Sequence, residues 1–344
     1  MCLPGYARPM TTYEQIIYSV ADPLATISLN RPAAFNAWTD QMAAEVFDAL
    51  RRATNDRSVV GIVITGEGRG FCAGADLEML RGISTGERGQ PEPVQLAGDA
   101  SWGDDFRGLY TSLMSVPKPI IAAINGAVAG MAVPLVLSCD LRFISTAGKI
   151  TMAFSQRGLI GEWGSSWLLP KLVGPSKALD IMLSSRLIGG AEAFQMGLAD
   201  RLFEPAELLP AATAYITDLA EKCSPTSMAI MKRQVYQQLH EGLGVAEREA
   251  RPSCGRASVG PTSPKECRRS LSVDRLSSVG SGADVGVYDV AIVGPNSASL
   301  LPVEWRWSPI LPRSSPVELR RSPTRRNWVA TLPSPSATPP SLAA

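Results

Sequence analysis

The sequence predicts an α/β fold that is followed by a helical region from about Pro175 and then by a largely disordered tail. Two continuous apolar runs, residues 59–65 and 120–124, are bounded by turn residues, which is the pattern of strands buried on both faces. Helical patterns separate the strands, and this alternation is typical of α/β cores with right-handed crossovers. Two more helices are expected at 208–222 and 226–239.

The N-terminal segment predicts a pair of strands and then a helix. Residues 13–20 and 24–29 are expected to form strands that are joined at Asp22-Pro23. Thr39 is a typical N-cap residue, because its hydroxyl can accept a main-chain N–H of the first helical turn. The apolar residues that recur at helical spacing after it are Met42, Val46, Phe47 and Leu50. An amphipathic helix is therefore expected to begin after Thr39.

The composition excludes several classes of function. The 344 residues carry 33 Lys and Arg and 32 Asp and Glu, a net charge of +1, so the chain lacks the basic footprint of a nucleic-acid-binding protein. One histidine and six cysteines without a C-x-x-C pair provide neither a zinc site nor a disulfide framework. No apolar run approaches the roughly 18 to 20 residues of a membrane span, and the N-terminus does not resemble a signal peptide. We therefore expect a cytoplasmic protein with reduced thiols, without a metal, a nucleic-acid partner or a membrane anchor.

The last 94 residues differ in composition from the rest of the chain. Residues 251–344 contain 17 Ser, 13 Pro and 11 Arg, but no Phe and no Met. Their 12 basic and six acidic residues give a net charge of +6, whereas the first 250 residues carry 21 basic and 26 acidic residues, a net charge of −5. Few large apolar side chains are present there to offset an entropy cost of about 1 to 2 kcal/mol per residue. We expect a folded domain at 12–250, helical from 200 onward, and a disordered or non-native tail at 251–344.

Two turns of small residues follow the two buried runs. The first is 70–76, Gly-Phe-Cys-Ala-Gly-Ala-Asp, and the second is 125–131, Asn-Gly-Ala-Val-Ala-Gly-Met. A turn of this kind that opens a helix leaves main-chain N–H groups free to face a negatively charged oxygen. A pair of such donors makes an oxyanion hole, in which each donor is worth roughly 3 to 4 kcal/mol. Tight turn geometry alone would also explain the glycines, so these residues leave both interpretations open.

Taken together, these segments resemble the enoyl-CoA hydratase/isomerase family, also called the crotonase family, over about residues 13–239. The pieces that carry the resemblance are, in order, Ile27-Ser-Leu-Asn-Arg-Pro32 with Asn36, Phe71-Cys-Ala-Gly-Ala-Asp76, Pro119-Ile-Ile-Ala-Ala-Ile-Asn-Gly126, Ser138-Cys-Asp140, Trp167-Leu-Leu-Pro-Lys-Leu-Val-Gly174 and Gly197-Leu-Ala199. The resemblance implies a spiral of ββα units and an acyl-CoA thioester as ligand, with no other cofactor. It also implies a homotrimer or a dimer of trimers.

The resemblance assigns the binding residues to the two turns. The family's oxyanion donors fall on the main-chain N–H groups of Ala75 and Met131. The family usually has glycine where Met131 stands, and this departure keeps the N–H but is expected either to tilt it or to narrow the acyl pocket. The residues that the resemblance implies for substrate binding are Ala73, Gly74, Asp76, Leu77 and Gly130.

The acidic residues of the sequence distinguish hydration from isomerisation. Hydratases of the family use two glutamates, but those positions fall on Pro134 and Phe154, which cannot transfer a proton. Glu162 falls where several isomerases of the family keep a lone acidic residue. A double bond moves when one proton is lifted from a carbon and one is returned to another, so a single carboxylate suits isomerisation.

The surroundings of Glu162 allow two interpretations. Its neighbours Ile160, Trp163 and Trp167 are apolar, and desolvation among such side chains would raise the pKa of a carboxyl group toward values useful in catalysis. Alternatively, Glu162 is a surface residue that is stabilised by the dipole of the helix that follows it.

Three functional hypotheses follow from the resemblance. The first is an enoyl-CoA isomerase of fatty acid metabolism that uses Glu162, and the second is an enoyl-CoA hydratase. The third is a catalytically impaired acyl-CoA-binding protein, because the family helices that complete the trimer and cover CoA should continue past Arg248. Beyond that point the sequence becomes rich in Arg, Ser and Pro, as it would if it were read in a shifted frame.

Two further predictions concern residues around the site. Cys72 and Cys139 lie in apolar surroundings and are expected to be inert core thiols. The polar, glycine-rich span 82–105 is longer than the about 12 to 15 residues of most loops, so we expect a long loop that could cover the acyl chain.

Overall fold

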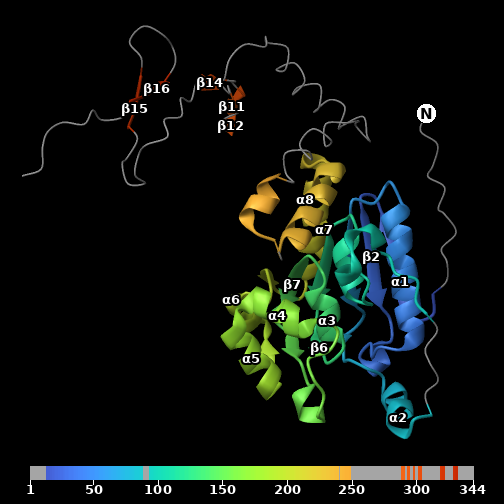
Figure 1. Ribbon diagram of the computed structural model, residues 1–344. Coiled ribbons are helices and arrows are strands. Elements are labelled where there is room, and N and C mark those ends of the chain that lie inside the picture. Colours follow the sequence, from blue (N-terminus) through green and yellow to red (C-terminus); the bar gives the residue numbers. More distant parts are fainter. Residues whose placement is uncertain are drawn as a thin grey trace, which may run out of the picture. The chain divides into compact units, whose positions relative to one another are not determined.

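The computed structural model describes residues 13–87, 93–239 and 241–248, together with six short strands after residue 287. The chain separates into two compact units, Met1–Ser270 and Leu271–Ala344. The first unit has the α/β fold that the sequence predicts (Figure 1). No helix among the described residues is long and apolar enough to cross a membrane.

A six-stranded sheet forms the centre of the first unit, in the order β1-β2-β3-β5-β7-β10. Its strands are β1 (Ile16–Ala21), β2 (Leu24–Leu29), β3 (Gly61–Gly66), β5 (Ile120–Ile124), β7 (Leu141–Ser145) and β10 (Arg201–Phe203). The strands β1 and β2 form the predicted antiparallel pair around Asp22-Pro23, and every other pair in this sheet is parallel. The strand β5 has the predicted bounds, whereas β3 begins two residues later than the apolar run.

A second, four-stranded sheet lies beside the first in the order β4-β6-β8-β9. Its strands are β4 (Gly70–Cys72), β6 (Ala127–Ala129), β8 (Lys149–Thr151) and β9 (Ile188–Gly189). Three of them follow a strand of the large sheet and precede one of the helices α2 (Leu77–Thr85), α3 (Ala132–Leu137) and α4 (Ser165–Val173). The successive units β3-β4-α2, β5-β6-α3 and β7-β8-α4 confirm the predicted spiral of ββα units.

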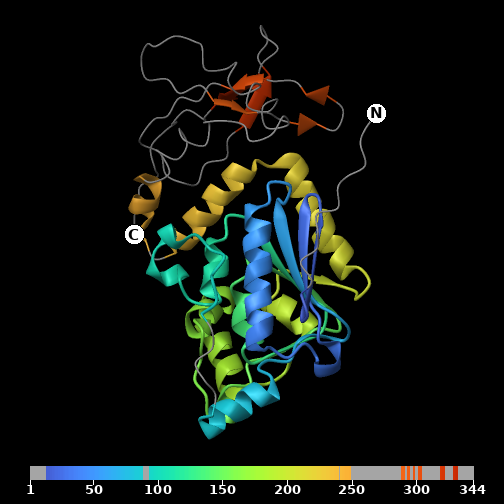
Figure 2. The same cartoon turned by 90° about the vertical axis from the view of Figure 1, so that its right-hand side faces the viewer.

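Two hydrophobic clusters cover opposite faces of the large sheet. On β3, Ile62 and Ile64 belong to the larger cluster, and Val63 between them belongs to the smaller one. Both faces are therefore buried, which is why this strand is a continuous apolar run. The helix α1 (Asp40–Asn55) closes the larger cluster and lies along β1 and β2 in Figure 2, and α7 (Leu208–Lys222) closes the smaller one.

The helices begin and end near the predicted residues. Thr39 is the N-cap of α1, because its Oγ1 accepts the N–H of Met42 at 3.0 Å. The remaining helices are α5 (Pro175–Ser184), α6 (Gly190–Met196) and α8 (Pro225–Gln238). In the described connections lie the short 3-10 helices η1 (Pro32–Ala34), η2 (Ala100–Trp102), η3 (Asp104–Phe106), η4 (Thr111–Ser115) and η5 (Ser155–Arg157). The bounds of α7 are those predicted, and α8 differs from its prediction by one residue at each end.

The predicted helical region after Pro175 is present, and it also contains the short strands β9 and β10, of which β10 extends the large sheet as a parallel neighbour of β7. The long connection expected at 82–105 is shorter at both ends, because α2 continues to Thr85 and η2 begins at Ala100. Aspartate side chains cap the N-termini of α2 and η2. Asp76 accepts a hydrogen bond from the N–H of Glu78 and Asp99 accepts one from the N–H of Ser101, each at 2.9 Å.

In the second unit the described residues form three pairs of short antiparallel strands. The pairs are β11 (Tyr288–Val290) with β14 (Leu301–Val303), β12 (Val293–Gly294) with β13 (Ser297–Ala298), and β15 (Glu318–Arg321) with β16 (Trp328–Thr331). The rest of 251–344 lies outside the described residues, so the predicted disorder of the tail stays a prediction.

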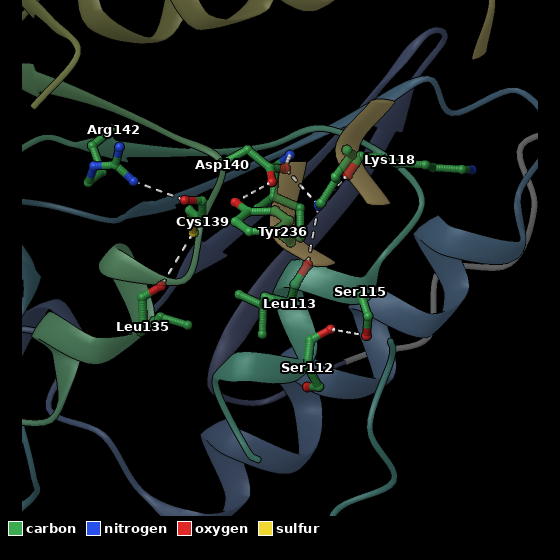
Figure 3. A network of polar contacts seen from close by, with 11 residues as sticks. Ser112, Leu113, Ser115, Lys118, Leu135, Cys139, Asp140, Arg142 and Tyr236 are labelled. Carbon is green, nitrogen blue, oxygen red and sulfur yellow. Dashed lines mark hydrogen bonds and ion pairs between the residues drawn. The ribbon is translucent and has the colours of Figure 1, made fainter. Parts of the chain in front are cut away.

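A buried polar network holds α8 against the end of the large sheet (Figure 3). The carboxylate of Asp140 accepts the N–H of Ile120 at 2.7 Å, the ammonium of Lys232 at 2.7 Å and the hydroxyl of Tyr236 at 2.8 Å. Lys232 also donates to the carbonyl of Leu113 at 3.2 Å. Burial lowers the pKa of Lys232, and the charge of Asp140 opposes this shift. The network therefore joins α8 to β5 and to η4 through one buried ion pair.

We expect the Asp140→Ala variant to lower the free energy of unfolding by about 3 to 5 kcal/mol, because it leaves the ammonium of Lys232 buried without its counter-charge. Urea unfolding of the full chain measures this loss. The matched control is Asp218→Ala, which removes an exposed ion pair with Lys222 on α7 and should cost less than about 1 kcal/mol. Equal losses in the two variants would contradict the role of the network.

Candidate functional site

The two small-residue turns touch each other at the ends of neighbouring strands. Each of these two segments contains one of the parallel neighbours β4 and β6, and the chain turns directly after the strand, from residue 73 in the first segment and from residue 130 in the second. Gly74 has a φ of +94°, and a Cβ at this position would lie 2.8 Å from the carbonyl oxygen of Ala129 and 3.8 Å from the Cα of Gly130. A side chain would thus be excluded both by the space and by the backbone conformation. Glycine at position 74 is what lets the two main chains meet.

The two predicted oxyanion donors come directly after these glycines. Neither Ala75 nor Met131 lies inside a helix or a strand, and within the described residues neither N–H donates to a backbone carbonyl. Both residues are half-buried, and the side chain of Met131 packs against the larger hydrophobic cluster. Two unused N–H groups on turns in contact are suited to bind one negatively charged oxygen.

Trp38 holds the first turn in place. Its N–H donates to the carbonyl of Gly74 at 2.7 Å, and the N–H of Asp76 donates to the carbonyl of Trp38 at 2.9 Å. These two bonds form a parallel bridge between Trp38 and Ala75. Trp38 is itself buried in the core, so the position of Ala75 is fixed from the interior of the protein.

Some of the substrate-binding residues predicted in and after the first turn are exposed, whereas Asp76 already makes hydrogen bonds within the protein. Ala73 and Leu77 are exposed and available to a ligand. The Oδ2 of Asp76 forms an ion pair with the Nη1 of Arg31 at 2.9 Å, and its Oδ1 accepts a hydrogen bond from the N–H of Glu78. Burial alone would raise the pKa of Asp76, but the N–H of Glu78 and the guanidinium of Arg31 more than offset this effect and lower the pKa. Asp76 therefore stabilises the turn, independently of its predicted role in substrate binding.

Glu162 lies in a tight turn before α4. Its carbonyl accepts the N–H of Ser165 at 3.0 Å and the hydroxyl of the same residue at 2.6 Å. Trp163 and Gly164, which follow it, have left-handed φ values of 55° and 77°. In the part of the chain that the structure describes, no hydrogen bond or ion pair reaches the half-buried Glu162 carboxylate. The fold fixes the backbone of this residue and leaves its carboxylate unused.

The expected apolar enclosure of Glu162 is wrong for this chain. Ile160 is 78% exposed and Trp163 is 44% exposed, because the segment before α4 lies at the surface of the unit. Trp167 is half-buried, and the ammonium of Lys171 lies 4.3 Å from the centre of its ring. Ile160 and Trp163 therefore do not enclose the half-buried Glu162 in an apolar pocket.

Three aromatic rings, Trp38, Tyr110 and Trp163, form an aromatic triad between the two parts of the site. The ring centres of Trp38 and Tyr110 are 5.9 Å apart, and those of Tyr110 and Trp163 are 5.7 Å apart, both in edge-on contact. Each contact of this kind is worth about 0.5 to 1.5 kcal/mol beyond the buried area. A Cβ built at Gly164 would lie 3.5 Å from a methyl group of Thr111, so the two segments also lie close together next to the rings. The triad therefore connects the turn of Ala75 with the turn of Glu162.

The triad could not be found from the sequence. Tyr110 lies among short 3-10 helices that have no hydrophobic periodicity, and its neighbours Trp38 and Trp163 are more than 50 residues away along the chain. Its position follows from tertiary packing alone.

The two positions to which the resemblance assigns the glutamates of the hydratases carry no carboxylate here, and the structure places Pro134 inside α3 and Phe154 in the core. Cys72 and Cys139 lie in the core as predicted, and burial raises the pKa of both thiols to about 12. Among the described residues no group of His, Cys, Asp and Glu side chains is arranged to hold a metal ion.

Comparison with known proteins gives a consistent family. Residues 20–253 match the family model described as enoyl-CoA hydratase/isomerase. The chain is 32% identical over 209 residues to the 1,2-epoxyphenylacetyl-CoA isomerase of Escherichia coli K12, with 60% of this chain and 76% of that protein covered. It is 31% identical over 199 residues to the crotonyl-CoA hydratase of Syntrophomonas wolfei, with 58% and 72% covered. A solved structure of a monofunctional enoyl-CoA isomerase from M. smegmatis superposes with a TM-score of 0.55 at 26% identity, over 68% of this chain and 98% of that one.

We expect the Gly74→Ala variant to lose more stability than Gly158→Ala. Both positions have a positive φ, but a Cβ at Gly158 meets nothing within 4 Å, whereas a Cβ at Gly74 meets the carbonyl of Ala129 at 2.8 Å. Gly158→Ala should cost about 1 kcal/mol for its conformation, and Gly74→Ala should cost a further 1 to 3 kcal/mol or so for the clash. Denaturant unfolding measures both values, and similar losses would show that the turns do not depend on this contact.

The Asp76→Asn variant should lose roughly 1 to 2 kcal/mol of stability at pH 7, because the asparagine cannot pair with Arg31 as a charged group. The pKa of Asp76 is lowered in the folded protein, so the ionised form stabilises the fold above the unfolded pKa of about 3.9. This contribution is lost as the pH falls through the lower, folded-state pKa. The difference in unfolding free energy between wild type and variant should therefore shrink below about pH 4; a constant difference would exclude the ion pair as its source.

Proposed function

The chain belongs to the enoyl-CoA hydratase/isomerase family, and from this premise we propose that it is an enoyl-CoA isomerase acting on an acyl-CoA thioester. The observation that carries the proposal is the unpaired carboxylate of Glu162, together with apolar residues at both positions to which the resemblance assigns a hydratase glutamate. Isomerisation moves a proton and adds no water, so one carboxylate is sufficient.

The two turns supply the electrostatic part of the reaction. The N–H groups of Ala75 and Met131 donate to the carbonyl oxygen of the thioester. Removal of a proton from the acyl chain pushes negative charge onto this oxygen, so the two donors stabilise the enolate more than the substrate. Because Trp38 and the contact at Gly74 already fix one turn against the other, little reorganisation is needed during the reaction.

Glu162 supplies the proton transfer. Its carboxylate takes a proton from C2 of a 3-enoyl-CoA, the electron pair moves through the double bond, and a proton returns at C4. The product is a 2-enoyl-CoA with the same atoms as the substrate. The absence of a bonded partner for the carboxylate within the described residues supports this role, since a carboxylate in an ion pair would be a weaker base.

Two other functions remain as candidates. A relative is named a hydratase, which favours water addition, but neither Pro134 nor Phe154 can assist it. The family match ends at residue 253, close to the point where the basic tail begins, which favours a catalytically impaired acyl-CoA-binding protein as the other candidate.

The remaining proposals concern binding and assembly. We propose that Ala73, Gly74, Asp76, Leu77 and Gly130 bind the substrate, that CoA enters only as part of the substrate, and that the protein is cytoplasmic. A homotrimer or a dimer of trimers is supported by large apolar side chains exposed on α5 and α8, which an assembly would cover. These side chains are Leu179, Leu183, Met231 and Val235, which are 57%, 72%, 61% and 60% exposed.

The Glu162→Gln variant should lower kcat for conversion of a 3-enoyl-CoA to the 2-enoyl-CoA by roughly 10²- to 10⁴-fold, because the amide keeps the shape but cannot accept the proton. Its affinity for a saturated acyl-CoA should stay unchanged. The assay follows the absorbance of the conjugated 2-enoyl thioester, and Glu78→Gln on α2 is the control at another glutamate.

The same assay separates the three functions. Water addition to a 2-enoyl-CoA by the wild-type protein would favour the hydratase, and binding without turnover would favour the impaired protein. Wild-type rates in Glu162→Gln would rule out Glu162 as the proton carrier.

A further inference from the structure

The hydroxyl of Tyr110 is a buried polar group that the fold does not use. Tyr110 is 1% exposed, and within the described residues its hydroxyl has no hydrogen-bond partner. Buried hydroxyls are almost always bonded, and leaving one unpaired is costly, so this exception requires an explanation. Two other buried polar atoms share this property, but Arg51 bonds through its other nitrogens and Ser138 lies at the far end of α3.

The position of this hydroxyl is fixed. The ring of Tyr110 is held edge-on by Trp38 on one side and by Trp163 on the other. The phenolic oxygen lies on the rotation axis of the ring, so a ring flip does not move it toward another partner. The protein therefore keeps an unpaired donor at one fixed point.

The ring that carries this hydroxyl lies between the two parts of the proposed site. Trp38 forms the bridge to Ala75, and Trp163 is the residue after Glu162. Burial raises the pKa of Tyr110 well above its ordinary value, and the neighbouring Cys72 at the end of β4 adds to this shift. The hydroxyl consequently stays protonated and can donate at any physiological pH.

We propose that the Tyr110 hydroxyl donates a hydrogen bond to an oxygen atom that the acyl chain of the substrate carries in addition to its thioester carbonyl oxygen. The protein then prefers acyl-CoA thioesters whose acyl chain carries an oxygen over thioesters of a plain hydrocarbon chain. The acyl group reaches the hydroxyl by displacing the ring of Trp163, which at 44% exposed is the member of the aromatic triad nearest to solvent. The inference rests on the proposed acyl-CoA site and adds the substrate class to it.

The test compares binding as well as turnover, so that it does not depend on isomerase activity. Calorimetry measures the Kd of the full-length protein for hexanoyl-CoA and for its 5-hydroxy and 6-hydroxy derivatives, and kcat/KM is measured with the matching 3-hexenoyl thioesters. Wild type should bind one hydroxylated thioester roughly tenfold or more tightly than hexanoyl-CoA, and Tyr110→Phe should abolish this preference. If the wild-type protein shows the binding preference but does not isomerise any of the thioesters, the proposed isomerase activity is contradicted and the role of Tyr110 in binding is still supported.

The control is Tyr236→Phe, which removes a hydroxyl that is bonded to Asp140 away from the aromatic triad. It should lower the Tm without changing the preference, whereas Tyr110→Phe should not lower the Tm, because no hydrogen bond is lost. A wild-type protein without any preference would overturn the proposal. A lower Tm with an unchanged preference in Tyr110→Phe would also overturn it, since the hydroxyl would then bind a structural water.

Discussion

The site depends on one close approach, that of the Gly74 main chain to the carbonyl of Ala129. Two ββα units place their second strands, β4 and β6, next to each other, and the turns after these strands meet because residue 74 has no side chain. This contact brings Ala75 and Met131, with their unused N–H groups, onto adjoining segments. The presence of two unused N–H groups on adjoining turns is therefore a consequence of the spiral fold, and the proposed two-donor site needs no particular side chain at either donor.

Other parts of the molecule keep this contact rigid. Trp38 bonds the first turn from the core, and Arg31 neutralises Asp76 where α2 begins. Further away, the ion pair of Asp140 with Lys232 joins α8 to the end of the sheet and to η4, the segment that follows Tyr110. The aromatic triad extends this support to the turn of Glu162.

The sequence was informative where local rules decide the structure. The buried strand β5, the N-cap at Thr39 and the helix α7 follow from apolar runs, capping and periodicity, and the structure confirms them. β10 was missed, because three residues are too few to show a period and their pairing with β7 is a tertiary effect. For the same reason neither the aromatic triad nor the surface exposure of Ile160 could be foreseen. The roles of Ala75, Met131 and Glu162 came from family resemblance, and they stay predictions.

A crystal structure of the protein with a bound saturated acyl-CoA would show whether the two N–H groups share one substrate oxygen. We expect the thioester carbonyl oxygen to lie about 2.7 to 3.1 Å from the main-chain nitrogens of both Ala75 and Met131, with C2 facing the carboxylate of Glu162. A carbonyl oxygen that contacts neither nitrogen, or nitrogens too far apart to share one oxygen, would contradict this expectation.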